Sequence, residues 1–251
     1  MAHGKRPARR GHHPPRRSGL RRCGRGVHTL AAYVEWAGAG GHPSDVFDPE
    51  GRGYVADGLQ YLLTGALCTR LAGHDDRGEN RAHEARLVAT DQRDHVREHP
   101  VERAAFAEFV GDALVIGDAG DAEGAYDRAA AAYEAAAPDD PVEWATQPPL
   151  AAATDLLQHC SRNTSREVAW DDLHGADPGG EEYLAHRARY KKRVFPAVVA
   201  SVLDAGVLHP PRGTTEHRSD DWRCPDCETN EVNWTGGEVV CLDCSARMES
   251  L

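Results

Sequence analysis

The sequence predicts an all-α body of repeat-like helical hairpins, followed by a small C-terminal β module. Apolar residues recur at helical spacing through most of the chain before residue 208. Beyond that point, two Cys-x-x-Cys pairs flank a stretch that reads as two short strands around a turn. The predicted organisation is a disordered basic arm over residues 1–26, a helical domain over 27–208, a linker over 209–220 and the β module over 221–251.

Length and composition limit the class of protein. A chain of 251 residues can form one sizeable core and a small appendage. No apolar run reaches the ~18 residues of a membrane span, and the N-terminal segment lacks the apolar core of a secretion signal. Outside the two pairs, Cys23, Cys68 and Cys160 are odd in number and scattered, as expected in a reducing compartment. We therefore expect a cytoplasmic protein without a membrane partner.

Charge is distributed unevenly along the chain. There are 40 acidic and 29 basic residues, and the lysines are only Lys5, Lys191 and Lys192. Because residues 1–26 contain nine basic residues and no acidic one, residues 27–251 carry 20 basic against 40 acidic residues. This lysine-poor, acidic and alanine-rich composition resembles that of proteins from extreme halophiles. In molar salt the Debye length is ~3 Å, so net charge would then say little about partners.

The basic arm over 1–26 has almost no apolar residues and cannot form a core. One interpretation is a tail that binds nucleic acid or an anionic surface. A second is a disordered arm, and a third is that the segment is not translated. Its basic composition contradicts the acidic body, so we predict that the arm is disordered and that the protein begins near Val27.

Helical periodicity predicts the elements of the body in order. A helix over 28–37 comes first, and a glycine-rich loop ends it. Two pairs of helices follow, each pair separated by a glycine turn. They cover 54–72 and 76–97, then 100–114 and 122–137.

The two helical pairs resemble each other. A shift of 47 residues places Leu59 on Phe106 and Gly73 on Gly120, with further apolar matches between them. Gly120 is followed by Asp-Ala-Glu-Gly-Ala and then by small residues four and seven positions further on, and the first pair has small residues at the matching places. This turn and second helix resemble those of a tetratricopeptide repeat, in which glycine makes the turn between two closely packed helices. Because the period exceeds the 34 residues of that family, we expect tetratricopeptide-like hairpins over 54–138.

Shorter helices are expected after the hairpins. One covers 150–159, and a capping box over 164–167 is expected to start another that ends at Leu173. A helix over 181–195 is followed by a further helix that Pro196 opens and Gly206 ends.

Cys224, Cys227, Cys241 and Cys244 are the predicted metal ligands. Their spacing can place four thiolates around one tetrahedral ion, and Zn²⁺ suits such a shell. The residues between the pairs predict a hairpin with strands over 231–234 and 238–240. Residues 222–248 resemble a zinc ribbon, which implies one structural Zn²⁺ per chain. A rubredoxin-like iron site uses the same ligands and remains an alternative.

A basic run over 186–193 stands out in the acidic body. Its candidate ligands for an anion or a nucleic acid are Arg187, Arg189, Lys191, Lys192 and Arg193. The alternative is a basic helix packed on an acidic side of the hairpins, with Tyr190 buried. We prefer this structural alternative, because runs of charge are more often paired within the protein or solvated than used to bind a ligand.

The function expected from these features is that of a non-enzymatic interaction or adaptor protein. The chain has no phosphate-binding glycine loop, nucleophile elbow or dinucleotide fingerprint. Stacked hairpins present a broad surface, so we expect a protein partner and no small-molecule substrate. The alternative is a nucleic-acid-associated regulator, of transcription or RNA, that uses the basic run beside the ribbon. Against it, residues 221–251 contain seven acidic residues and two arginines, which disfavours phosphate.

Overall fold

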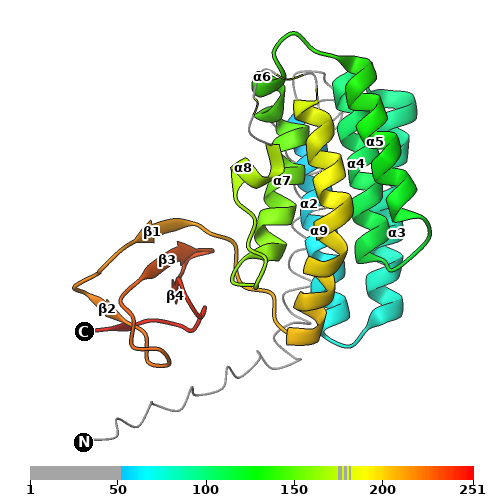
Figure 1. Cartoon of the computed structure of the whole chain (residues 1–251). Helices are drawn as coiled ribbons and strands as arrows, with labels where there is room; N and C mark the ends of the chain where they lie inside the picture. Colours follow the sequence, from blue (N-terminus) through cyan, green and yellow to red (C-terminus); the bar gives the residue numbers. More distant parts are fainter. Residues whose placement is uncertain (1–51, 175–176, 178–179, 181) are drawn as a thin grey trace, which may run out of the picture. The chain divides into compact units, whose positions relative to one another are not determined.

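The computed structural model describes residues 52–174, 177, 180 and 182–251 (Figure 1). The basic arm predicted for 1–26 and the helix predicted for 28–37 lie outside the described residues. Contacts between Cα atoms divide the described chain into a helical unit that ends at Leu208 and a β unit that begins at His209. No described helix has both the length and the apolar character needed to cross a membrane.

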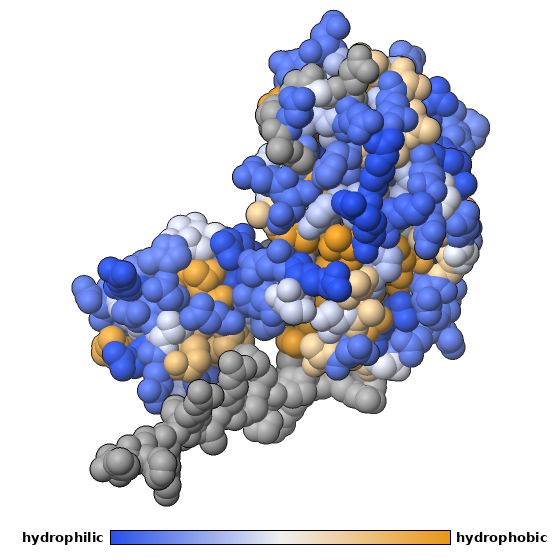
Figure 2. Space-filling view, viewed as in Figure 1, coloured by the Kyte–Doolittle hydropathy of each residue, from blue (hydrophilic) through white to orange (hydrophobic). Residues whose placement is uncertain are grey.

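The helical unit confirms the predicted all-α body, and hydrophilic residues cover much of the face of it that the space-filling view shows (Figure 2). Its elements are α2 (Arg52–Leu71), α3 (Asp75–Asp91), the π-helix η3 (Gln92–Val96), α4 (Pro100–Ile116), α5 (Ala122–Ala136), α6 (Pro141–Ala145), α7 (Pro148–Ser161), α8 (Trp170–His174) and α9 (Tyr183–Ala205). The helix predicted over 76–97 corresponds to α3 continued by η3, while the short helix α6 was not predicted.

Helix α4 is the central element of the helical unit. It contacts α2, α3, α5, α7 and α9, and only Pro100, Arg103, Leu114 and Val115 along its length are not buried. A helix enclosed in this way has to be apolar nearly all round. Helix α7 contacts α2 and α4, and α9 contacts α4 and α5, so the two later helices cover a face that the hairpins share (Figure 1).

The two hairpins, α2/α3 and α4/α5, turn at equivalent glycines. Gly73 and Gly120 have φ values of 78° and 73°, a left-handed conformation that favours glycine. Each hairpin also has a glycine where its two helices pack closely, although the two glycines are not at equivalent positions. A Cβ on Gly78 of α3 would overlap a side chain of α2, and a Cβ on Gly111 of α4 would come within 2.7 Å of the Tyr126 ring of α5.

Replacement of the turn glycine tests this geometry. Gly120→Ala is expected to lower the free energy of unfolding by about 1–2 kcal/mol, because alanine is strained at positive φ. Its Cβ would also lie 3.3 Å from Leu114 Cδ2. Urea unfolding followed by circular dichroism measures the change. Gly73→Ala at the equivalent turn is expected to give a similar loss, and no loss at either position would contradict the left-handed turns.

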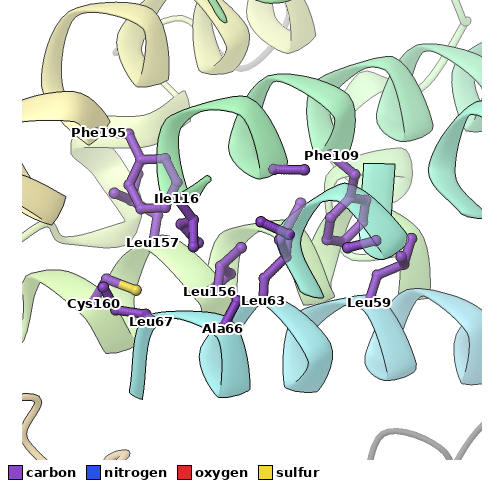
Figure 3. Packing of buried hydrophobic residues seen from close by; sticks show 14 of the residues in the cluster. Leu59, Leu63, Ala66, Leu67, Phe109, Ile116, Leu156, Leu157, Cys160 and Phe195 are labelled. Atoms are coloured by element: carbon purple, nitrogen blue, oxygen red, sulfur yellow. The ribbon is translucent and has the colours of Figure 1, made fainter. Parts of the chain in front are cut away.

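The main core of the helical unit lies where α2, α4, α7 and α9 meet. Figure 3 shows Leu59, Leu63 and Leu67 of α2 in the same cluster as Phe109 and Ile116 of α4. The cluster also contains Leu156, Leu157 and Cys160 of α7 and Phe195 of α9. The i, i+4, i+8 spacing of the three α2 leucines confirms the apolar face that was predicted for this helix.

The prediction that Pro196 opens a separate helix was wrong. Helix α9 runs without interruption from Tyr183 to Ala205, with the proline inside it, and ends at Gly206, where φ is 68°. Residues on both sides of the proline are buried against the same neighbouring helices, including Phe195 and Val198. Tertiary packing on both sides therefore outweighs the local tendency of proline to break a helix.

The predicted capping box over 164–167 does not form, and no helix starts there, because its two side chains accept hydrogen bonds from other backbone groups. Asn163 N–H donates to the Glu167 carboxylate at 3.3 Å, and Arg166 N–H donates to the Thr164 hydroxyl at 3.2 Å. The short helix α8 begins only at Trp170. These bonds satisfy the backbone of a turn, which is the other role that serine and threonine side chains commonly take.

The β unit consists of two small antiparallel sheets. Its strands are β1 (Thr214–Glu216), β2 (Trp222–Arg223), β3 (Val232–Thr235), β4 (Glu238–Cys241) and β5 (Glu249–Ser250). Strands β3 and β4 form the predicted hairpin, with Val232 opposite Cys241. Strand β1 pairs with β3, so part of the segment predicted as a linker over 209–220 belongs to the three-stranded sheet. Strands β2 and β5 form the second sheet.

A buried asparagine holds the segment that leads into β1. Asn233 Oδ1 accepts from Gly213 N–H at 2.8 Å, and Asn233 Nδ2 donates to the Pro211 carbonyl at 3.2 Å. A Cβ on Gly213 would overlap the Trp234 carbonyl, so glycine is what lets this segment pass so close to β3. Proline and glycine in a polar stretch predict a loop, and that pattern concealed the strand.

Candidate metal centre

The structure brings the four predicted cysteine ligands together within the β unit. Their ligand atoms all lie within 4.8 Å of one another. Cys224 Sγ is 3.4 Å from Cys244 Sγ, and Cys227 Sγ is 3.5 Å from Cys241 Sγ. A tetrahedral ion with metal–sulfur bonds of ~2.3 Å requires sulfur atoms about 3.8 Å apart. The four sulfur atoms therefore fit around a single metal ion.

Both Cys-x-x-Cys loops have the same backbone geometry. Glu228 N–H donates to the Cys224 carbonyl at 3.0 Å, and Ser245 N–H donates to the Cys241 carbonyl at 3.0 Å. Glu228 and Ser245 each follow the second cysteine of a pair and have φ values of 63° and 64°. Two equivalent turns thus present two cysteines each to the same point, as a tetrahedral shell requires.

The cluster places four ionisable thiols in contact. Burial raises the pKa of Cys241 to about 12 and raises the pKa of Cys244 above its ordinary value. Burial also opposes ionisation of Cys224, but N–H groups of Cys227 and Asp226 donate to its sulfur and lower its pKa overall. Four thiolates repel one another unless a cation neutralises them, so this donor set fits a bound metal ion.

Few other residues hold the β unit together. Its buried cluster consists of Cys224, Cys241, Val232 and Met248, and half-buried side chains such as Trp222 pack against it. A core of this size contributes little folding free energy by itself. Four protein ligands also fill every position of a tetrahedral ion and leave none for water or a substrate.

The predicted basic run over 186–193 lies in the first half of α9, and the structure separates its members. Arg187 and Lys191 are 0 % exposed. The hypothesis that they belong to an anion-binding surface is therefore wrong for these two residues, because neither reaches solvent. Arg193 lies over the ring of Tyr190, 5.9 Å from its centroid, and that tyrosine is half-buried, not buried as expected.

The other two members of the run pair with acidic residues at the surface. Lys192 Nζ lies 2.7 Å from Asp127 Oδ2, and Arg189 pairs with Glu134. Both acidic residues belong to α5, so α9 packs on an acidic side of the second hairpin. The structure thus agrees with the structural interpretation of the basic run.

Arg187 and Lys191 neutralise two buried carboxylates of α4. Glu108 accepts from Arg187 Nε and from Lys191 Nζ, both at 2.9 Å, and Asp112 accepts from Lys191 Nζ at 2.6 Å. All four side chains are fully buried. Each helix contributes two residues four positions apart, so the two pairs face each other. These four residues form what we call the buried ion cluster.

Tyrosines of α5 complete the carboxylate side of the buried ion cluster. Tyr133 donates to Glu108 at 2.9 Å, and Tyr126 donates to Asp112 at 2.7 Å. Burial raises the pKa of Glu108, but the two neighbouring cations outweigh it and lower the pKa overall. Burial dominates at Asp112 and raises its pKa. Because each carboxylate accepts several hydrogen bonds, both are well satisfied despite their depth.

Helices α7 and α8 complete the cation side of the cluster. Arg187 Nη2 donates to the Leu150 carbonyl at 2.8 Å, and Lys191 Nζ donates to the Ala153 carbonyl at 3.1 Å. Burial, followed by the neighbouring guanidinium of Arg187, lowers the pKa of His174 to about 4, so this histidine is neutral. Its Nε2 lies 3.3 Å from Arg187 Nη1 and accepts from it, while Nδ1 lies 3.0 Å from the Trp170 carbonyl.

Sequence reasoning found the cations of this cluster and missed the carboxylates. Glu108 and Asp112 have the same i, i+4 spacing as Arg187 and Lys191, and they are the two charged residues in the otherwise apolar stretch 104–116 of α4. Acidic residues on a helix that is apolar on every side have to be paired, so this spacing was the available signal.

Comparisons of the chain with models of protein families, with curated proteins and with solved structures found no match. The resemblances to a zinc ribbon and to tetratricopeptide repeats therefore have no support from a relative.

Proposed function

We propose that the β unit is a zinc ribbon that holds one structural Zn²⁺, and that the protein is a non-enzymatic adaptor that binds a protein partner through this ribbon. The observation that carries the proposal is the closed set of four cysteine sulfur atoms. A metal with four protein ligands stabilises a fold and has no open position for catalysis. The ribbon would then be a rigid module held in shape by its metal.

Zinc is the metal that we propose, and a rubredoxin-like iron site with the same four thiolates is the alternative. Structural Cys₄ sites of small β modules bind zinc in tetrahedral geometry. Iron in the same shell would give a coloured, redox-active protein. Metal analysis and the visible absorption spectrum of the purified full-length protein distinguish the two metals.

An exposed tryptophan that packs on a half-buried one supports a binding role for the ribbon. Trp234 on β3 is 40 % exposed, and its ring meets that of Trp222 edge-on, with centroids 5.6 Å apart. Exposed tryptophans are among the residues that contribute most to protein–protein interfaces. In the helical unit, by contrast, α7 and α9 cover a face of the hairpins that a partner would otherwise reach.

Charge indicates what kind of partner the ribbon suits. Residues 221–251 contain seven acidic residues and two arginines. A surface of this charge repels nucleic-acid phosphates and attracts a basic protein segment, whose Lys or Arg side chains can also stack on tryptophan. The partner we propose is therefore a protein with a basic docking segment.

Affinity capture with matched tryptophan variants tests the adaptor function. Full-length protein is expected to recover a protein partner that resists nuclease treatment, and Trp234→Ala is expected to reduce recovery at least about tenfold, as for an interface hot spot. Trp170→Ala is the control, because Trp170 is 37 % exposed but belongs to the helical unit.

Two outcomes would contradict the proposal. Release of the captured material by nuclease would favour the nucleic-acid-associated alternative. Equal recovery by Trp234→Ala and the unchanged protein would show that the ribbon does not form the binding surface.

A further inference from the structure

A groove lies on the helical unit where η3, α4 and α5 meet. Its volume is about 450 Å³. Apolar side chains line much of it, notably Ala107 of α4 and Ala132 and Ala136 of α5. Three arginines also line it, Arg93 from η3, Arg103 from α4 and Arg128 from α5. We call this site the arginine groove.

The arginine groove reverses the charge of its surroundings. Asp94 is its acidic lining residue, and Arg93 satisfies that carboxylate with two hydrogen bonds, Nε to Oδ1 at 2.7 Å and Nη2 to Oδ2 at 2.8 Å. Arg103 and Arg128 then leave the groove with a positive excess. Residues 27–251 as a whole carry twice as many acidic as basic residues, so this excess is opposite in sign to the rest of the body.

The π-helical turn of η3 fixes one of these arginines in place. In an α-helix, Arg97 N–H would donate to the Arg93 carbonyl, but here it donates to the Gln92 carbonyl at 2.8 Å. The Arg93 carbonyl is thereby available, and Arg103 Nε donates to it at 3.0 Å. This bond uses the Nε of Arg103 and leaves its two Nη groups to bind elsewhere. Turns of this kind occur frequently at functional sites.

The terminal guanidinium groups have spare hydrogen-bonding capacity. Among the residues that the structure describes, neither the Nη groups of Arg103 nor the guanidinium of Arg128 has a hydrogen-bond or ion-pair partner. Guanidinium groups bind carboxylates and phosphates through paired, charge-assisted hydrogen bonds. An anion between these two side chains would supply the missing acceptors.

We propose that the arginine groove binds a small organic anion with a short hydrocarbon body. Its carboxylate or phosphate group would accept from Arg103 and Arg128, and its hydrocarbon would cover the alanines. The volume lies within the range of small-molecule sites, which are mostly apolar with a few polar groups that fix orientation. The site belongs entirely to the helical unit, so the inference is independent of the function proposed for the ribbon.

The extent of the groove favours a small ligand over an acidic helix. Its lining on α5 spans residues 128–136, about 12 Å at 1.5 Å per residue. Helix-in-groove recognition usually involves anchors at i, i+3, i+4 and i+7, along a longer apolar channel. A carboxylate or phosphate with a chain of several carbons matches the available length.

Calorimetric titration and NMR chemical-shift mapping of the full-length protein test the proposal. The probes are octanoate and octyl phosphate, with octylammonium as the probe of opposite charge. Both anions are expected to bind and to shift amides in residues 93–107 and 128–136, and octylammonium is expected to bind at least about tenfold more weakly. The comparison of the two anions distinguishes a preference for carboxylate from one for phosphate.

Three variants distinguish binding at the arginine groove from non-specific attraction to positive surface charge. Arg128→Gln is expected to weaken binding of the anions about tenfold, since it removes charge-assisted hydrogen bonds from an exposed residue. Ala132→Phe is expected to abolish binding by filling the groove. Arg77→Gln, which removes an exposed arginine of α3, is the control and is expected to change nothing.

Equal binding of octylammonium, shifts outside these two segments, or unchanged binding by Arg128→Gln would each overturn the proposal. The proposal would also be overturned if the protein bound an acidic, alanine-rich peptide at this groove but bound neither anion.

Discussion

Cys227→Ser is expected to abolish zinc binding and to unfold the β unit while the helical unit stays folded. Structural zinc contributes an apparent ~10–16 kcal/mol to the folding of modules of this kind. The buried cluster of the β unit is small and includes two of the four cysteines, so little else can replace that contribution. A serine hydroxyl is a poor substitute for a thiolate at such a site. The effect is therefore close to all-or-none for residues 222–248.

Two measurements check this expectation together. Elemental analysis should find one zinc per chain in the unchanged protein and none in the variant, while far-ultraviolet circular dichroism should keep its helical signal. Cys160→Ala is the matched control, because this fully buried cysteine lies in α7 and not in the β unit. It should weaken the helical unit and leave the zinc content unchanged. Iron in the purified protein, or a β unit that stays folded without metal, would contradict the proposed zinc ribbon.

Lys191→Met is expected to lower the free energy of unfolding of the helical unit by about 3–5 kcal/mol, the usual cost of removing one partner from a buried ion pair. Lys191 Nζ lies 2.9 Å from Glu108 Oε1 and 2.6 Å from Asp112 Oδ2. Methionine fills similar volume but leaves Asp112 buried without its cation. The loss should therefore reflect charge and not packing.

The neighbouring lysine provides the control. Lys192 pairs with Asp127 at the surface, where water and salt screen the interaction, so Lys192→Met should cost far less. The double variant Asp112→Asn/Lys191→Met should recover part of the loss, because it removes the carboxylate that the single variant leaves unpaired. Chemical denaturation of the three variants gives the comparison. Similar losses for Lys191→Met and Lys192→Met would show that the buried ion cluster does not stabilise the fold.

The sequence was sufficient to predict those features of the fold and the site that a strong local pattern specifies. Four cysteines in two matched pairs predicted the metal ligands and the hairpin between them, and the structure brings those sulfur atoms together. Apolar spacing and glycine turns likewise predicted the two hairpins. Gly73 and Gly120 adopt the left-handed conformation that such a turn requires.

Features that depend on distant contacts were harder to predict. Pro196 is kept within α9 by packing on both sides of it, and β1 forms because Asn233 holds the polar segment that leads into it. In the same way, the sequence favoured a structural role for the basic run but did not identify Glu108 and Asp112, roughly eighty residues earlier in the chain, as its buried partners. Periodicity within a segment carries no information about which segment will face it.

The buried ion cluster restricts how this protein can change over evolutionary time. A single substitution that removes the charge of Glu108, Asp112, Arg187 or Lys191 leaves an uncompensated buried charge. Substitution of a surface member of the same basic run, such as Lys192, leaves no buried charge uncompensated. We therefore expect the four positions to be inherited as a set, or replaced together by apolar residues, while the rest of the run drifts. Descendants that keep the set would then have two isolated cations one turn apart on α9, even after the basic run around them had disappeared.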